Sequence, residues 1–101
     1  NETTLGWFKN LPKADKKFAK EYLGIRSSKD AVWLCIRACF ASVSDTAIIP
    51  MQDYLELDME ARINTPSTLG GNWVWRMKSD AITDELCSKM HDYARIYGRL
   101  R

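Results

Sequence analysis

The stretch Ala31-Val32-Trp33-Leu34-Cys35-Ile36, continued by Ala38-Cys39-Phe40-Ala41, is apolar nearly all round. Ser27 and Asp30 before it have the spacing of a capping box, so a helix is expected to begin there. A helix that is apolar on most of its surface has to be covered on most sides. Its one charge, Arg37, needs a carboxylate partner or a route to water. Two further helices of a 101-residue chain provide too little cover, so a larger body is expected around this helix.

A short β-branched run follows this helix. Thr46-Ala47-Ile48-Ile49, ended by Pro50, predicts a buried strand at about 46–49. The backbone groups of a strand have to be paired, and no second convincing strand is present in the sequence. The chain also opens on Asn1 rather than on methionine. These features lead us to expect a piece of a longer protein.

Two more helices can be predicted from periodicity. One follows Leu11, with Pro12 in its first turn and Gly24 as its C-cap. Its apolar face is expected to contain Leu11, Ala14, Phe18 and Tyr22. The other begins at Thr83 as N-cap and ends at Gly98. Its apolar face is expected to contain Leu86, Met90, Tyr93, Ala94 and Tyr97.

Composition excludes several classes of protein. With 46% apolar and 28% charged residues, the 101-residue chain is one globular domain at most and is not disordered. A net charge of +2 is too mild to indicate a nucleic-acid partner. No apolar run approaches the roughly 20 residues that a membrane span needs, and no secretion leader is visible. Three cysteines, an odd number, indicate reduced core thiols, so we expect a cytoplasmic protein without a membrane partner.

Metal and nucleophile chemistry have only weak support in the sequence. Two pairs with four-residue spacing could in principle bind zinc: Cys35 with Cys39, and Cys87 with His91. Both pairs fall in helices with core periodicity, so ordinary core thiols are the favoured interpretation. A Cys87–His91 nucleophile lacks an orienting third group. We therefore expect no metal and no cofactor.

Carboxylates and aromatic residues offer a second kind of chemistry. An acidic cluster follows the predicted strand: Asp53, Glu56, Asp58 and Glu60. Barrel enzymes keep their sites beyond such strand ends, but alone this cluster is more typical of helix caps and solvent. Flat rings and amides also recur together: Trp7, Phe8, Asn64, Asn72, Trp73 and Trp75. Sugars suit such surfaces, although composition alone favours Trp73 and Trp75 as anchors of a loop to the core.

Five stretches carry a resemblance to a known family. Residues 1–8, Asn-Glu-Thr-Thr-Leu-Gly-Trp-Phe, resemble the sequence that follows the His-Asp of a His-Asp-Asn motif in amylomaltases. Residues 41–55 resemble the last barrel strand of these proteins and the turn after it. Residues 60–66 and 71–76 resemble their long loop, and Tyr97-Gly98-Arg99 resembles the end of their final helix. The chain is thus similar, in order and over its whole length, to the disproportionating enzymes or 4-alpha-glucanotransferases.

The resemblance implies an α/β fold class. Residues 1–101 would form a single segment at the C-terminal end of a catalytic (β/α)8 TIM barrel. This segment would be mostly α-helical in isolation, with one barrel strand at about 46–49 and a glucan-cleft loop at about 58–76. The family transfers α-1,4-glucan segments between maltodextrins by a retaining double displacement. Its Asp nucleophile, its Glu acid/base and a third Asp all precede Asn1, so the isolated chain is expected to be inactive.

The resemblance implies substrate-binding residues but no catalytic residue in this chain. The implied contacts with α-1,4-glucans or maltodextrins are Asn1, Asn64, Gly70, Gly71, Asn72 and Trp73. Asn64 is the first choice, through its amide. Gln52 and Asp53 are expected to be structural, and Arg62 and Arg76 to hold the loop by pairing with acidic groups.

One alternative function remains open at this point. The chain could be a non-catalytic helical interaction module derived from the barrel end. In either case, an exposed strand edge and a large apolar patch lead us to expect that the isolated chain self-associates.

Overall fold

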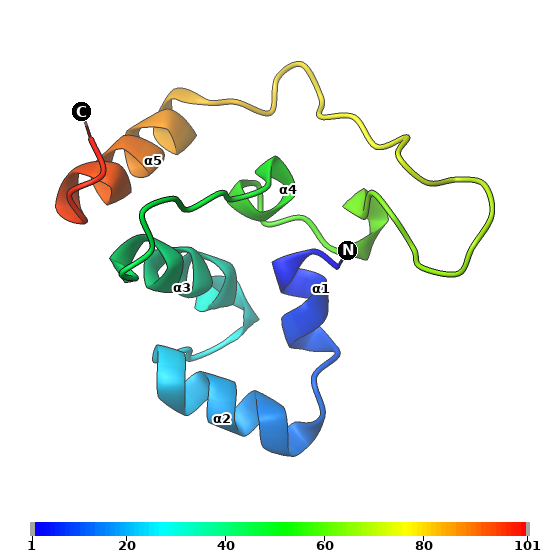
Figure 1. Ribbon diagram of the computed structural model, residues 1–101, viewed down its shortest axis with the longest axis horizontal. Helices are drawn as coiled ribbons and strands as arrows, with labels where there is room; N and C mark the ends of the chain where they lie inside the picture. Colours follow the sequence, from blue (N-terminus) through cyan, green and yellow to red (C-terminus); the bar gives the residue numbers. More distant parts are fainter. Residues whose placement is uncertain (1, 101) are drawn as a thin grey trace.

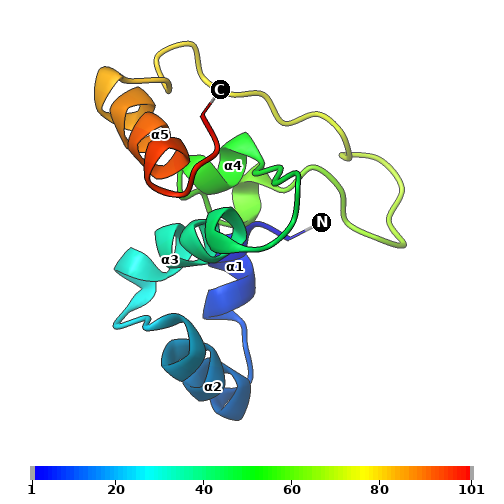
Figure 2. The same cartoon turned by 60° about the vertical axis from the view of Figure 1, so that its left-hand side comes forward.

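A computed structural model describes residues 2–100 of the chain (Figure 1). Within this range the elements are, in chain order, α1 (Thr4–Lys9), α2 (Lys13–Leu23), α3 (Ser28–Ala41), α4 (Met51–Tyr54), the 3-10 helix η1 (Met59–Ala61) and α5 (Asp84–Ile96). Residues 62–83 form an open arc that projects from the helices in both views (Figures 1 and 2). The expected mostly helical character is therefore confirmed. No helix in the described range is long and apolar enough to cross a membrane.

Helix α3 lies at the centre and contacts α1, α2, α4 and α5. Its predicted capping box is present, because the backbone N–H of Ser27 donates to Asp30 Oδ1 at 3.1 Å and the Ser27 side chain caps the helix in return. The buried residues of α3 are Ala31, Val32, Trp33, Ile36 and Phe40. Arg37 reaches solvent beside the exposed Cys39. One side of this nearly all-apolar helix is therefore open among the described residues.

Helix α5 packs against α3 with the face that its periodicity predicts. Its five predicted apolar residues all contact the α3 core cluster: Leu86, Met90, Tyr93, Ala94 and Tyr97. The rings of Trp33 and Tyr93 meet edge to face, with their centroids 5.0 Å apart. Such aromatic pairs contribute about 0.5–1.5 kcal/mol beyond their buried area. The predicted N-cap is confirmed too, since the Thr83 hydroxyl accepts from the backbone N–H of Leu86 at 3.1 Å.

The predicted bounds of α2 are confirmed, but the burial of its apolar face is wrong. Pro12 precedes the helix, and Gly24 ends it in the left-handed conformation. Phe18 and Tyr22 are 67% and 78% exposed, and their rings stack on each other. The buried residue is Ala19 instead. The reason is that no element in residues 2–100 covers the side of α2 that carries the two rings.

The segment between α3 and α4 contains no strand among the described residues. Residues 46–49 are neither helical nor paired in a ladder, and Ile48 is 85% exposed. A strand forms only where a neighbour pairs its backbone groups, so the barrel strand at 46–49 stays a prediction.

Where the chain leaves α3, Arg99 forms a clamp of hydrogen bonds on its backbone. The guanidinium of Arg99 donates to the carbonyl oxygens of Phe40 at 2.8 Å, Ser44 at 3.0 Å and Ser42 at 3.3 Å. It also approaches the carbonyls of Cys39 and Asp45. The last carbonyls of a helix have no partner within the helix and favour a cation. Arg99 therefore satisfies this end of α3.

The cysteines do not all lie in the core as expected. Cys39 and Cys87 are exposed, so the expectation of core thiols is wrong for both. Cys35 is half-buried, and burial raises the pKa of its thiol above the usual range. Both residues lie in helices, as predicted, but the faces that carry Cys39 and Cys87 have no covering element in the described range.

Candidate functional site

Asp53 ties the residues after segment 46–49 to the beginning of the chain. Its carboxylate accepts from the backbone N–H and from the hydroxyl of Thr4, each at 2.8 Å. Gln52 beside it is buried, and its amide donates to the carbonyl of Ala61 at 3.4 Å. Both residues thus have the structural role expected of them. Together they hold α1, α4 and η1 in one arrangement.

A small cavity of about 90 Å³ lies where these elements meet. The residues that line it are Glu2, Thr3, Pro50, Gln52, Asp53, Ala61, Arg62 and Ile63. Two predicted site residues adjoin it in sequence. Asn64 directly follows Ile63 and is half-buried. Asn1 precedes Glu2 but lies outside the described residues. The fold therefore brings the neighbours of Asn1 and Asn64 to one cavity.

The loop that follows is closed across its base by Asn72. The amide oxygen of Asn72 accepts from the backbone N–H of Thr65 at 2.9 Å, and its nitrogen donates to Thr68 Oγ1 at 3.2 Å. The backbone N–H of Trp73 donates to the carbonyl of Ile63 at 2.6 Å. The amide of Asn72 is thus engaged in holding the loop. Its predicted contact with sugar stays a prediction.

Arg62 holds the same loop, though not through an acidic group. Its Nε–H donates to the carbonyl oxygen of Asn64 at 2.9 Å. The expected partner was a carboxylate, and the backbone carbonyl takes its place because it lies only two residues away. This bond fixes the backbone at Asn64, the residue that the resemblance places first in substrate binding.

Backbone conformation explains the glycines of the loop. Gly70 and Gly71 have φ of 79° and 71°, in the left-handed region that favours glycine. Trp73 also has a positive φ, and its side chain is 70% exposed. A flat apolar ring is therefore presented to solvent at the end of the loop. Trp73 does not anchor the loop to the core, whereas Trp75 is half-buried.

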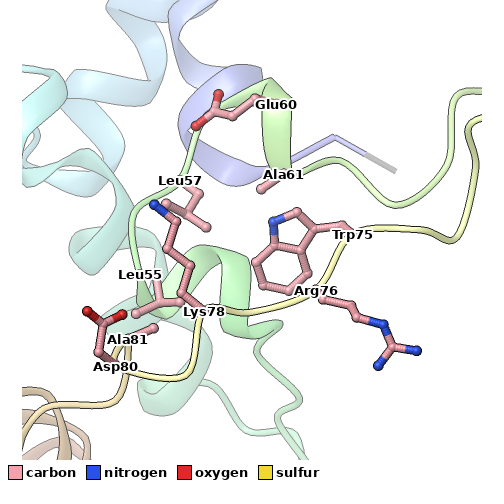
Figure 3. Close-up of a pocket in the computed structure, with 9 residues that line it drawn as sticks. All are labelled: Leu55, Leu57, Glu60, Ala61, Trp75, Arg76, Lys78, Asp80 and Ala81. Carbon is pink, nitrogen blue, oxygen red and sulfur yellow. The ribbon is translucent and has the colours of Figure 1, made fainter.

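Trp75 lines a larger cavity of about 340 Å³ (Figure 3). The lining residues are Leu55, Leu57, Glu60, Ala61, Trp75, Arg76, Lys78, Asp80 and Ala81. Ala61 lines both cavities. Sequence reasoning missed the larger one. The available signal was the pair Leu55 and Leu57 on either side of Glu56, whose positive φ of 55° has no signature in the sequence.

The acidic residues of this region serve separate structural functions. Asp53 binds Thr4, whereas Asp58 Oδ2 accepts from Lys9 Nζ at 2.6 Å. This hydrogen bond is the main cause that holds the pKa of Asp58 below its usual range and the pKa of Lys9 above its own. The interpretation as caps and solvent-facing charges therefore fits better than a catalytic carboxylate set. Among residues 2–100, no three His, Cys, Asp or Glu side chains gather as a metal site.

Comparison with known proteins identifies the family. Residues 1–83 match a family model described as 4-alpha-glucanotransferase. The chain is 45% identical over 100 residues to a 4-alpha-glucanotransferase of Clostridium butyricum, and the match covers 98% of this chain and 20% of that protein. It is 44% identical to the chloroplastic/amyloplastic 4-alpha-glucanotransferase of Arabidopsis thaliana, over 99% of this chain and 18% of that protein.

A solved structure agrees with these sequence matches. The amylomaltase from Streptococcus agalactiae in complex with acarbose superposes with a TM-score of 0.93 at 35% identity, over 100% of this chain and 20% of that chain. The chain spans about a fifth of the length of each of these relatives. Sequence and structure agree over nearly every residue of the chain, which therefore belongs to the 4-alpha-glucanotransferase family.

Proposed function

We propose that residues 1–101 form a single segment at the C-terminal end of the catalytic barrel of a 4-alpha-glucanotransferase. The parent enzyme would transfer α-1,4-glucan segments between maltodextrins by a retaining double displacement. This segment would supply part of the glucan-binding cleft but none of the catalytic carboxylates. The observation that carries the proposal is the superposition on an amylomaltase over the whole chain, with a TM-score of 0.93.

The cleft contribution centres on the loop at about 58–76. An amide at Asn64 offers one donor group and one acceptor group, which is what sugar hydroxyls require. The exposed ring of Trp73 offers a flat surface for the CH face of a sugar. The full set of proposed contacts is Asn1, Asn64, Gly70, Gly71, Asn72 and Trp73. Support for Asn1 comes from its chain neighbour Glu2, which lines the same cavity as Ile63.

A chimera tests this role of the loop. The chain would replace the matching 100 residues of the Clostridium butyricum enzyme, and glucose release from maltotriose would be measured. We expect an active chimera, in which Asn64→Ala lowers kcat/KM by about 10-fold through loss of one hydrogen bond to substrate. Leu69→Ala is the control, since Leu69 is 103% exposed at the loop tip. An inactive but folded chimera, or an unchanged Asn64→Ala variant, would contradict the proposal.

The isolated chain is proposed to be inactive. Release of glucose and longer maltodextrins from maltotriose by the pure 101-residue protein would overturn this part of the proposal. We also propose a cytoplasmic location, supported by three thiols that form no disulfide with one another.

A helical interaction module is the second candidate. It is favoured by the stacked rings of Phe18 and Tyr22, which stand exposed on α2. Calorimetric titration of the isolated chain with maltoheptaose distinguishes the two functions. The module would be favoured by a stable chain that has no affinity for the sugar but binds a protein partner, provided that Phe18→Ala abolishes this binding.

A further inference from the structure

The larger cavity is lined by none of residues 64–73, although Glu60, Ala61, Trp75 and Arg76 belong to the loop at about 58–76. Its volume of about 340 Å³ is at the lower end of small-molecule pockets. It lies between the α4–η1 turn and the returning segment 75–81 (Figure 3). A space of this size is large enough for one sugar ring.

The floor of the cavity is apolar because of a local reversal of the chain. The backbone N–H groups of Leu55 and Leu57 donate to the carbonyls of Met51 and Gln52, each at 2.9 Å. Leu55 and Leu57 consequently line the same cavity. The indole of Trp75 points toward these leucines from the opposite side (Figure 3). A ligand would therefore meet one flat aromatic face and an aliphatic surface opposite it.

The rim of the cavity carries charges of both signs. Asp80 and Glu60 provide carboxylates and Lys78 provides an ammonium, whereas the guanidinium of Arg76 points away (Figure 3). Glu60 Oε1 already accepts from the backbone N–H of Asp58 at 3.3 Å, so its other oxygen is the one left for a ligand. A turn closed by the Ala81 N–H and the Lys78 carbonyl, 3.2 Å apart, brings Lys78 and Asp80 to one side. Within residues 2–100, neither of these two side chains has a hydrogen-bond or ion-pair partner. Both are available to a ligand.

We propose that this cavity binds a single glucosyl unit, outside the proposed cleft contacts. The CH face of the sugar would stack on Trp75, while its hydroxyls would donate to Glu60 and Asp80 and accept from Lys78. Because the rim is mixed in sign, an anion or a cation would meet a like charge there, and a neutral polyhydroxylated ring would not. The choice of glucose among pyranoses rests on the proposed function.

Nuclear magnetic resonance on the 101-residue chain tests the proposal. The chain has four tryptophans and therefore four indole N–H signals: Trp7, Trp33, Trp73 and Trp75. Methyl α-glucoside in the millimolar range should shift the Trp75 signal saturably and leave the signal of the core residue Trp33 in place. Trp75→Phe assigns the signal.

Matched variants show whether the cavity itself is responsible. Ala81→Phe fills the cavity and should abolish the shift, whereas Ala14→Phe, the same change at an exposed position of α2, should leave it intact. If the Trp33 signal reveals that Ala81→Phe has unfolded, Asp80→Asn and Lys78→Met replace it. Each should weaken binding about 10-fold through the loss of a hydrogen bond to a charged group.

Several outcomes would overturn the proposal. The first is that methyl α-glucoside does not shift the Trp75 signal. The second is that phenol shifts this signal and the sugar does not. The third is that the sugar shifts the signal equally in Ala81→Phe. None of these three results changes the activity expected of the chimera or the loss of activity expected in its Asn64→Ala variant. A failure of this site is therefore distinguishable from a failure of the proposed function.

Discussion

At the scale of single residues, Arg99 binds backbone carbonyls at several positions around the end of α3. Its planar guanidinium reaches carbonyls on the last turn of α3 and on the residues after it. A lysine ammonium keeps the charge but not the fork of donors. Arg99→Lys should therefore lower the free energy of unfolding by about 1–2 kcal/mol in urea titrations.

Arg37→Lys is the matched control for this prediction. Arg37 lies on the exposed side of α3, where a surface substitution changes stability by no more than about 0.5 kcal/mol. Equal losses in the two variants would show that the bonds of Arg99 to the carbonyls contribute nothing specific.

Single residues also show where sequence reasoning succeeds. The capping box at Ser27 and the N-cap at Thr83 were predictable because the bonds they make stay within four residues. Asp53 was expected to be structural, but its partner Thr4 lies 49 residues away. A local sequence pattern cannot predict a hydrogen-bond partner this far away in the chain. The same holds for the carbonyls that Arg99 binds.

At the scale of elements, an ion pair joins α1 to η1 and makes their contact pH-dependent. Lys9 depresses the pKa of Asp58, so this stabilisation is present above the carboxyl's unfolded pKa of about 4 and is lost as the pH falls through the lower folded pKa. Lys9→Met should therefore lower Tm at neutral pH, and the difference from the unmodified chain should close in acid.

Melting curves between about pH 2 and pH 7 at low ionic strength measure this difference. Lys13→Met is the control, because it removes an equal charge from the first turn of α2 without touching Asp58. A Lys9→Met difference that stays constant down to the lowest pH would contradict the assignment.

The side-chain amide of Asn72 bonds across the base of the loop at 58–76, beside the backbone bond from Trp73 to Ile63. Without the bonds of Asn72 to Thr65 and Thr68, the base of the loop should open more often. In Asn72→Ala, the Trp73 amide, which bonds to the carbonyl of Ile63, should exchange with solvent about 10-fold faster. Amides of α3 should not change. Ser79→Ala, outside the loop, should leave the Trp73 amide as it was.

Elements were predicted where their periodicity is long. Helices were expected after Ser27 and between Thr83 and Gly98, and the structure has α3 and α5 there. Helix α1 was missed because it has only six residues and contains Gly6, although Thr3 caps it locally, and Asp53 adds a bond to Thr4 from a distant part of the chain. The burial of the apolar face of α2 was predicted wrongly, since periodicity defines a face but not what covers it.

At the scale of the whole molecule, the chain is looser than a compact domain of its size. Its radius of gyration is 14.7 Å, whereas about 13 Å is typical of 100 residues. Apolar side chains stand in solvent on α2 and on the irregular segments: Phe18, Tyr22, Val43, Ile48 and Leu69. We therefore expect the isolated chain to self-associate in sedimentation experiments. A clean monomer at high concentration would contradict this expectation.

The two cavities could not have been predicted at this scale. Each cavity lies between segments that are distant in the sequence. Turns bring these segments together, and hydrophobic periodicity does not show where the turns direct the chain. The larger one requires a left-handed backbone at Glu56 and the return of residues 75–81 toward Leu55. The predicted strand at 46–49, by contrast, has a clear local pattern, but it can form only beside a neighbouring strand, which residues 2–100 do not supply.

The Arg99 clamp also has a consequence for the order of assembly. The carbonyls that it binds precede it by 54 to 60 residues. During synthesis, this end of α3 therefore lacks its hydrogen-bond donor until most of the chain has been made. Until then, residues 42–49 are held by α3 at one end and by α4 at the other, but their carbonyls lack the cation. We expect the backbone between these ends to stay adjustable during that time, and the arrival of Arg99 to fix the conformation that it has reached.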